Sequence, residues 1–395
     1  MELQGIGNYF AQRRFNTNSV IIDVPAALHF VQRVGIEHED LVTNALGLYT
    51  IETNVKNGKV KFLLPTGEGY ITKARPASCA WDPYAGITYD REEVTLCPHN
   101  IQVEHCTEEV PGLEGIFGQG NDVEDLVSTE TGQRMFADLV EWIYSSMGSD
   151  AVKSSHFGKH PVVASAEASF TGSPELYSRI KNTLSICGGF LTMADQYKAQ
   201  GEANFAVPIA PENTNGDKYT GNVIDLFNSV VAAQPKKLKA LISKKRAKGV
   251  NPIMLVSGGI FDAYKTHLID THPAISDAWH FKLTAELCSR YGCVEGSFAD
   301  DVLLWDGFWI KRMGIWDEVA ADLEIIHHRV LLTVPGNFGI GLDVDSVPGN
   351  KGVGLKFDTS DQVKDAGKIY LATNYRMGTS ILMKDLCVNA SYLAA

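Results

Sequence analysis

The sequence predicts an α+β fold, and three observations lead to this prediction. Two dipeptides that favour tight turns, Asn57-Gly58 and Asp306-Gly307, each separate two strand-like runs, as in β-hairpins. A long amphipathic helical pattern lies within residues 121–155, and the C-terminal segment consists of strand-like runs interrupted by glycine. With 395 residues, of which 45% are hydrophobic and 21% charged, the chain can form two or three ordinary globular domains.

Net charge and cysteine usage restrict the class of protein. A net charge of −12 argues against nucleic-acid binding as the main function, because phosphate neutralisation needs clustered Lys and Arg. Seven cysteines with irregular spacing argue against a disulfide framework and indicate a reducing compartment. The N-terminal residues do not resemble a signal peptide, and no uninterrupted apolar run approaches about 18 residues. We therefore expect the protein to be made and kept in the cytoplasm, or in an assembly formed there.

The N-terminal third begins with an arm and continues as strands. The arm carries Arg13 and Arg14, an apolar patch at Val20–Val24 and a short predicted helix at Ala26–Val34. From Leu46 the pattern alternates, with Asn57-Gly58 as the turn of a hairpin.

A long excursion interrupted by Gly and Pro follows at Thr66–Arg91, and Val94–Cys106 then reads as a strand broken at Pro98. After a glycine-rich joint, apolar residues recur at three- and four-residue spacing up to about Ser155. This spacing predicts a long helix with one buried stripe.

The middle third alternates helices with short strands. Pro174 suits the first turn of a helix that is predicted to run to Tyr197, and two more helices follow up to about Ala247. The basic run Lys236–Lys248 has helical spacing, which indicates a solvated amphipathic face or, alternatively, a contact with an anion or another subunit. An apolar strand then ends in Gly258-Gly259 before another helix, and the Asp306-Gly307 hairpin comes next.

The sharpest enzyme-like motif is SGGIFD at Ser257–Asp262. A strand, a Gly-rich turn and a helix N-terminus can form an anion site, because free backbone N–H groups and the helix dipole both favour phosphate. The motif is similar to the Ser-Gly-Gly-x-Asp-Ser loop of ATP pyrophosphatases, but Asp262 comes one place late and Ala263 replaces the final Ser. A tight strand-to-helix turn is the preferred interpretation, and a nucleotide site is the alternative.

Other possible sites match known patterns poorly. The glycines of Gly336–Gly341 are expected to let strands bend or approach closely, because no strand-turn-helix unit surrounds them. One residue of the pair His327 and His328 should face inward and the other outward. Ligand types for zinc occur at Cys97, His99, His105 and Cys106, but their spacing fits none of the usual zinc patterns. Cys288 and Cys293 are expected to be small buried side chains. Asp343, Asp345 and Ser346 are similar to the start of a calcium loop, but no glutamate closes its frame. We expect no catalytic residue, metal or cofactor.

Three C-terminal stretches carry a resemblance to a known family. They are VLLWDGFWIKRMGIWDE at Val302–Glu318, RVLLTVPGNFGIGLD at Arg329–Asp343 and IYLATNYRMGTSILMKDLCV at Ile369–Val388. In residue pattern and in order they resemble the major capsid proteins of tailed bacteriophages, whose Hong Kong 97-type fold also occurs in encapsulins. The order of the remaining parts fits the same family.

The resemblance implies a division of the chain into five parts. Residues 1–50 would be the N-terminal arm, 51–91 the extended loop, and 92–160 the peripheral domain with its spine helix. Residues 161–335 would be the axial domain, and residues 336–395 the strands that return to the peripheral domain. The extended loop would lie across a neighbouring subunit.

The implied function is a major capsid protein that assembles into hexamers and pentamers of an icosahedral head. The implied partners are further copies of the chain, a portal and cement proteins, and double-stranded DNA enclosed without sequence-specific binding. No cleaved scaffolding leader is recognised, so a separate scaffolding protein is expected; no membrane is implied. The location would be the virion capsid, assembled in the host cytoplasm. The alternatives are an encapsulin-like compartment shell and an ATP-using enzyme built around Ser257–Asp262.

Overall fold

A computed structural model of the full chain describes most of the C-terminal two thirds and several N-terminal strands. The described residues are 14–16, 19–21, 47–53, 55–65, 89–106, 146, 148–246, 252–271, 279–282, 298–343, 356–358 and 368–394. Within these ranges no helix has the length and apolar character needed to cross a bilayer. The predicted helix at Ala26–Val34 and most of the helix predicted in residues 121–155 lie outside the described residues, although residues 148–157 are helical.

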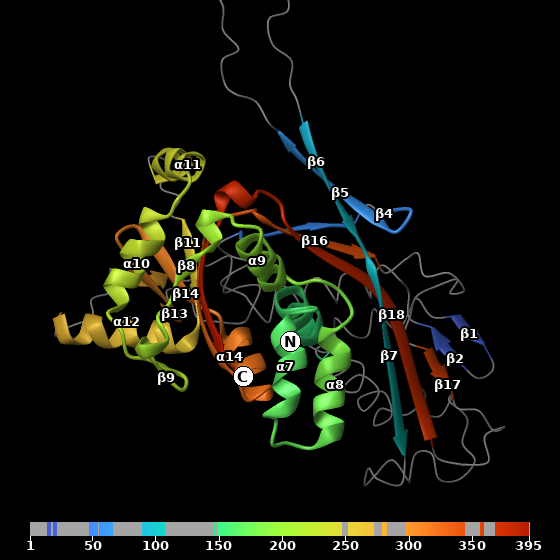
Figure 1. The fold of residues 1–395 in the computed structure, drawn as a ribbon. Helices are drawn as coiled ribbons and strands as arrows, with labels where there is room; N and C mark the ends of the chain where they lie inside the picture. The colour runs from blue at the N-terminus through green and yellow to red at the C-terminus, as the bar shows by residue number, and fades with distance from the viewer. Residues whose placement is uncertain are drawn as a thin grey trace, which may run out of the picture.

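The larger of the two main sheets has seven strands, in the order β12-β13-β14-β11-β15-β19-β8 (Figure 1). Strand β11 lies at its centre, parallel to β14 and antiparallel to β15. The last strand of the chain, β19, pairs with β15 along seven residue pairs. The bounds are β8 Val207–Pro208, β11 Ile253–Val256, β12 His280–Lys282, β13 Phe298–Trp305, β14 Phe308–Arg312, β15 Ile326–Thr333 and β19 Val388–Ala394.

Helices cover both faces of this sheet, which explains why its central strands are buried throughout. Ile253 and Leu255 of β11 belong to one apolar cluster, whereas Met254 and Val256 belong to another on the opposite face. Residues of α7, α8, α9 and α14 contribute to the first cluster, and residues of α10, α11 and α12 to the second. The bounds are α7 Pro161–Ser165, α8 Pro174–Leu184, α9 Phe190–Ala199, α10 Val223–Ala232, α11 Lys236–Arg246, α12 Gly258–Thr271 and α14 Gly314–Asp322.

The second main sheet is built around β18, the longest strand described. Its order is β17-β18-β16-β3, and β7 also pairs with β18 over ten residue pairs. In Figure 1, β7 and β18 form a long ribbon beside the helices α7 and α8. The bounds are β3 Tyr49–Glu52, β7 Cys97–Cys106, β16 Phe338–Asp343, β17 Lys356–Asp358 and β18 Lys368–Ile381.

A third, three-stranded sheet projects from the body. Its order is β4-β5-β6, with bounds Val55–Lys56, Lys59–Pro65 and Tyr89–Thr95. Figure 1 shows β5 and β6 leading away from the two main sheets. Leu96 separates β6 from β7, so the same chain segment runs from the projecting sheet directly into the β7–β18 ribbon.

Short elements complete the described structure. Two small antiparallel pairs join β1 (Arg14–Asn16) to β2 (Ser19–Ile21), and β9 (Thr214–Asn215) to β10 (Lys218–Tyr219). Single 3-10 turns are η3 Ala166–Ala168, η4 Ala203–Phe205, η5 Pro211–Asn213 and η7 Lys384–Leu386. Together with the helices and sheets above, they confirm the predicted α+β class.

Both predicted hairpins are confirmed by their turn geometry. Asn57 and Gly58 have φ values of 55° and 70° between β4 and β5. Asp306 and Gly307 have φ values of 42° and 71° between β13 and β14. Positive φ at both central residues is the requirement that made these dipeptides a strong signal.

Two predicted boundaries are wrong. The helix predicted from Pro174 to Tyr197 is two helices, α8 and α9, because the chain breaks at residues 185–189. The strand break expected at Pro98 falls at Leu96, and Pro98 itself lies in β7 opposite Arg376. Among the described strands β7 pairs only with β18, and proline is tolerated in a strand with a single partner more readily than in a central strand.

Candidate assembly surface at the base of the projecting hairpin

The projecting sheet is attached to the body by a small apolar cluster. Its buried members come from β5, β6 and the segments next to β6 and β18: Val60, Phe62, Val94, Leu96 and Leu382. Each of the other two clusters has more than twenty buried members. The sheet is therefore held at its base with little buried apolar surface of its own.

Glycines in β16 allow this sheet to pack closely on the body. A Cβ atom at Gly341 would lie 2.8 Å from Leu96 Cδ2 and 3.0 Å from Val60 Cγ2. A Cβ atom at Gly339 would lie 2.6 Å from Leu382 Cδ2. The prediction that the glycines of Gly336–Gly341 serve close strand approach is thus confirmed for Gly339 and Gly341, whose near neighbours include side chains of the projecting sheet. Gly336 instead lies in the turn before β16, with a φ of 77°.

The opposite face of the sheet is charged. Lys59 and Lys61 each place Nζ 3.6 Å from a carboxylate oxygen of Glu93. All three side chains are partly exposed, so these pairs add little to stability. One face of the projecting sheet therefore meets the body while the other carries a mixed-charge surface that is open to a partner.

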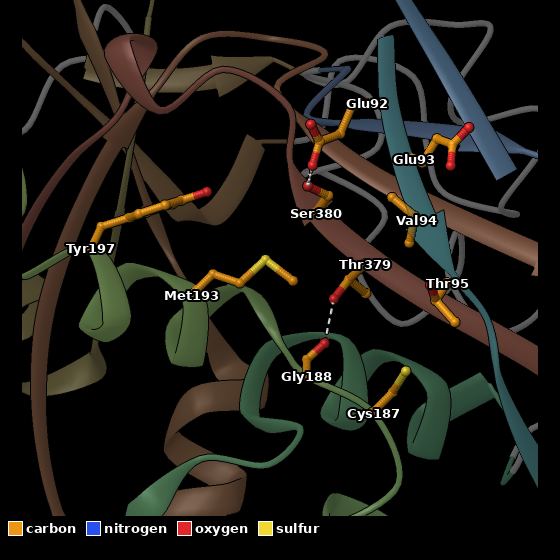
Figure 2. Close-up of a pocket in the computed structure, with 10 residues that line it drawn as sticks. All are labelled: Glu92, Glu93, Val94, Thr95, Cys187, Gly188, Met193, Tyr197, Thr379 and Ser380. Atoms are coloured by element: carbon orange, nitrogen blue, oxygen red, sulfur yellow. Dashed lines mark hydrogen bonds between the residues drawn. The ribbon is translucent and has the colours of Figure 1, made fainter. Parts of the chain in front are cut away.

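A cavity of about 270 Å³ lies where β6 meets the body (Figure 2). Ser380 Oγ donates to Glu92 Oε1 at 3.1 Å, and Thr379 Oγ1 donates to the Gly188 carbonyl at 2.6 Å. These two bonds connect β18 to β6 on one side and to the α8–α9 connection on the other. The lining residues are Glu92, Glu93, Val94, Thr95, Cys187, Gly188, Met193, Tyr197, Thr379 and Ser380.

A disulfide links the first residue of β7 to the α8–α9 connection. Cys97 and Cys187 are bonded with a Cα–Cα distance of 5.7 Å, although 90 residues separate them in sequence. The sequence-based expectation of cysteines without a disulfide is therefore wrong for this pair. Cysteine spacing could not reveal it, because only the packing of β7 against the helices brings the two residues together.

A buried charged network fixes the helices to the large sheet. Arg329 of β15 is fully buried and its Nη2 donates to both carboxylate oxygens of Asp195, at 3.0 and 2.9 Å. His160 Nε2 lies 2.8 Å from the same carboxylate. Burial acts to raise the pKa of Asp195, but the charge of Arg329 and the hydrogen bonds from both partners outweigh it and hold that pKa well below its usual range.

Two histidines of β15 are both buried, contrary to the prediction that one would face outward. His327 lies against Phe157 and Trp316, whereas His328 is on the opposite face, where its Nε2–H donates to the Gly216 carbonyl oxygen at 3.0 Å. The reason is that helices and loops cover both faces of the large sheet. Burial lowers the pKa of each of these histidines.

The SGGIFD motif forms a strand-to-helix turn whose backbone donor is already used. The Gly258 N–H donates to Asp317 Oδ1 at 2.7 Å, and Arg312 Nε donates to Asp317 Oδ2 at 2.9 Å. A protein carboxylate thus lies where an anion would bind at the start of α12. The Asp262 side chain is exposed and lies 3.4 Å from Arg312 Nη1. This arrangement favours the tight turn over a nucleotide site.

Of the remaining residues singled out in the sequence, those whose side chains the structure describes do not form a common site. Cys97 is committed to the disulfide, and buried His99 stacks on Tyr375 with ring centroids 4.6 Å apart. Within the described part of the chain, no group of three or more potential ligands could hold a metal ion. The side chains of Arg14, His105 and Cys106, and the whole of Arg13, Cys288, Cys293, Asp345 and Ser346, lie outside the described residues.

The basic run forms the amphipathic helix that its spacing predicts. Leu238 and Ile242 of α11 are buried in the second cluster, whereas Lys236, Lys239 and Lys244 are exposed. Lys237 Nζ lies 3.3 Å from Oδ2 of Asp385, the middle residue of η7. In Figure 1, α11 lies at the outer end of the large sheet's helical layer. The exposed lysines therefore form a basic surface at one end of the domain.

Comparisons with known proteins give matches in structure only. No protein-family model and no curated protein matches the sequence. The solved structures similar to this chain include viral capsids and an encapsulin shell.

Three of these structures illustrate the likeness. The satellite phage P4 procapsid has a TM-score of 0.48 at 9% identity, covering 98% of this chain and 95% of the other. The capsid of Ralstonia phage GP4 has a TM-score of 0.40 at 10% identity, with 89% of each chain covered. The holo-SrpI encapsulin complex from Synechococcus elongatus has a TM-score of 0.38 at 12% identity, covering 90% and 87%. At these identities no residue role is transferred.

Proposed function

We propose that this chain is the major capsid protein of a tailed bacteriophage, and that copies of it form the hexamers and pentamers of an icosahedral head. The observation that carries the proposal is the projecting β4–β5–β6 sheet, which leaves the body with one small apolar cluster at its base. A hairpin of this kind gains little stability alone and becomes stable when a partner covers it.

The resemblance in the C-terminal stretches supports the same function. Three elements of the two main sheets lie in stretches that resemble the capsid family. They are the Asp306-Gly307 hairpin, the strand that contains Gly339 and Gly341, and the long strand that contains Arg376. These strands make up a rigid body from which the hairpin extends. A shell subunit needs both parts, because closed shells require defined angles between neighbours.

We propose a structural role, without catalysis, for the SGGIFD turn. Its Gly258 donor is satisfied by Asp317, and its Asp262 side chain is exposed and paired with Arg312. The ATP-using enzyme is therefore the weaker alternative. Titration of the purified chain with ATP and Mg²⁺ by calorimetry is expected to give no heat of binding.

The proposal includes the partners that the resemblance implies. They are further copies of the chain, a scaffolding protein, a portal, cement proteins and enclosed double-stranded DNA, and the mature location is the virion. The net charge of −12 suits a container whose wall does not hold the duplex by charge. A shell with a strongly basic inner surface would contradict this view of the wall.

The experiment is negative-stain electron microscopy of the purified chain with light scattering on the same sample. Closed shells or capsomer rings are the expected result. A variant in which residues 59–95 are replaced by a short Gly-Ser linker should lose the particles, whereas Gly314→Ala, a site with open space around it, should retain them. Particles that persist without the hairpin would contradict the role given to it. Nuclease-protected DNA in particles from infected cells would distinguish a phage head from an encapsulin-like compartment, which would hold protein cargo.

A further inference from the structure

The disulfide lies at the point where the projecting sheet joins the body. Cys97 follows Leu96, the single residue between β6 and β7, and Leu96 itself belongs to the small cluster that anchors the sheet. A covalent bond at this position restricts the angle at which β6 leaves the β7–β18 ribbon. We therefore expect the bond to affect the direction in which the hairpin projects more than the packing inside the two large apolar clusters.

The other end of the bond is firmly held. The α8–α9 connection that carries Cys187 accepts a hydrogen bond from Thr379 Oγ1 at the Gly188 carbonyl, and the Gly189 N–H donates to the Gly158 carbonyl at 2.8 Å. A Cβ atom at Gly189 would lie 2.3 Å from the His156 carbonyl oxygen, so the two backbones are in close contact. Cys97 is thus tied to a rigid part of the helical layer.

A small reagent can approach the cysteine pair from the cavity and from the partly exposed Cys97, although Cys187 itself is buried. Cys187 lines the cavity of about 270 Å³ beside β6, and Cys97 on the neighbouring strand is only partly buried. Figure 2 shows Cys187 at the edge of this cavity, close to Thr95 and Thr379. By contrast, Cys387 is a free thiol that is completely buried. Within the described part of the chain, the bonded pair is therefore the place where exchange with a small thiol can occur.

We propose that Cys97 and Cys187 form a reversible oxidation site that locks the hairpin base after the chain has assembled. A low-molecular-weight disulfide, such as glutathione disulfide, is the oxidant. One cysteine thiolate attacks it and releases one thiolate to form a mixed disulfide. The second cysteine thiolate then displaces the other small thiolate, so two protein thiols lose two electrons and two protons, and one disulfide is reduced to two thiols. The timing of this step rests on the proposed function, since the reducing compartment is where a phage head would assemble.

The reduced form leaves the hairpin base freer to adjust. Without the bond, the described attachments of the sheet to the body include the small apolar cluster, the Ser380–Glu92 hydrogen bond and the approach of Arg376 to the Asn57-Gly58 turn. Such noncovalent contacts fit a subunit that must adopt slightly different angles in pentamers and hexamers. With the bond, the angle chosen during assembly is fixed. The site would thus convert an adjustable joint into a rigid one when the particle meets an oxidising medium.

The test begins with the redox state of the full chain. Cells that produce it are lysed in the presence of iodoacetamide, and peptides containing Cys97 and Cys187 are quantified by mass spectrometry. We expect both to be alkylated at lysis, and both to be protected after incubation with glutathione disulfide. A bond already complete at lysis, or two cysteines that stay alkylated after oxidation, would overturn the proposal.

Hydrogen–deuterium exchange then tests the lock. Oxidation of the native chain should slow exchange in residues 89–106 at least several-fold and raise the melting temperature by roughly 5 °C, as expected for a loop of this length. Cys97→Ser and Cys187→Ser should remove both responses, whereas Cys387→Ala should retain them. Equal exchange in the oxidised and reduced native chain would refute the lock without relying on any variant. Because exchange reports on one chain, light scattering on the same samples separates a failed lock from a failed shell assembly.

Discussion

Arg329, a fully buried residue of β15, forms an ion pair with Asp195, a partly buried residue of helix α9. Both oxygens of Asp195 accept from Arg329 Nη2, while Arg329 Nη1 donates to Asn389 Oδ1 at 3.2 Å. The guanidinium is fully buried, so it depends on these partners for its charge and its donors. Strands β15 and β19 and helix α9 are therefore coupled through one side chain.

Asp195→Asn is expected to destabilise the fold strongly. The substitution keeps the shape of the side chain but leaves the Arg329 charge buried without its counter-charge, at a cost of about 3–5 kcal/mol in the free energy of unfolding. Urea denaturation at neutral pH measures it. Glu175→Gln, on the exposed face of α8, is the matched control and should change stability by less than about 0.5 kcal/mol. A similarly small change for Asp195→Asn would contradict the importance of the pair.

Acid should destabilise the fold before the carboxylates titrate. Burial lowers the pKa of His156 to about 3, and burial together with the charges of Arg329 and His160 lowers that of His327 well below 6.5, although Asp195 acts in the opposite direction. A lowered folded-state pKa means that the unfolded chain binds the proton first. The contribution of each neutral, buried histidine to the free energy of unfolding is fully present above about pH 6.5. It is lost as the pH falls toward the folded-state pKa, by about 1.4 kcal/mol per pH unit and per histidine.

His327→Leu tests this assignment. Neither ring nitrogen of His327 has a hydrogen-bond partner in the described structure, and the ring packs against Phe157 and Trp316. An apolar side chain should therefore be tolerated at pH 7, and the slope of stability against pH between 6.5 and 5 should become shallower by about 1.4 kcal/mol per unit. Between pH 7 and 8 the slopes of variant and wild type should coincide. An unchanged slope in the acid range would show that His327 is protonated in the folded state.

Gly341→Val is expected to push the projecting sheet off the body. Its side chain would collide with Leu96 and Val60, which a Cβ atom alone would approach to 2.8 and 3.0 Å. Such overpacking costs about 1–3 kcal/mol, and the effect should be local to the hairpin base. Limited proteolysis should show faster cleavage in residues 59–95 in the variant. Gly314→Ala has open space around it and serves as the control; cleavage at the wild-type rate in Gly341→Val would mean that the hairpin adapts without moving.

Arg376→Ala is expected to weaken the closure of the terminal strands. Arg376 lies opposite Asp343 in the β16–β18 pair and opposite Pro98 in the β7–β18 pair, and its Nη1 comes close to the Asn57-Gly58 turn. Loss of the side chain should lower the melting temperature by a few degrees, as for a loss of about 1–2 kcal/mol. Arg376→Lys, which keeps the charge and most of the aliphatic stem, should lie between alanine and wild type. Equal melting temperatures for all three proteins would show that the Arg376 side chain does not stabilise the pairing of the terminal strands.

Features set by neighbouring residues could be predicted from the sequence, whereas those set by distant ones could not. Asn57-Gly58 and Asp306-Gly307 specify their turns through their own backbone preferences, and the Lys236–Lys248 run specifies its helix through spacing. The Cys97–Cys187 bond joins residues 90 positions apart, and Arg329 meets Asp195 across 134 positions. No local pattern carries information about either pair.

The error at His327 and His328 has the same origin. Alternation along β15 correctly separates the two side chains onto opposite faces, but whether a face is exposed depends on helices from other parts of the chain. The candidate surface was foreseen in part. The hairpin and the close approach of Gly339 and Gly341 followed from the sequence, and the cavity and the disulfide at its base did not.

The basic surface of α11 gives a prediction about assembly. We expect the exposed Lys236, Lys239 and Lys244 to meet an acidic surface of a neighbouring copy, because the chain as a whole has a net charge of −12. Replacing these three lysines with Glu should reduce shell or capsomer yield at least tenfold. The melting temperature of the unassembled chain should stay within about 2 °C of wild type, because exposed charges contribute little to folding.

The same change in charge at the exposed residues Lys198, Lys218 and Lys265 is the matched control. Light scattering across a salt series measures both variants, and wild-type assembly should weaken as salt rises, since screening reduces the attraction between the subunits. If the two triple variants lose assembly equally, the effect belongs to net charge and α11 is not a specific contact.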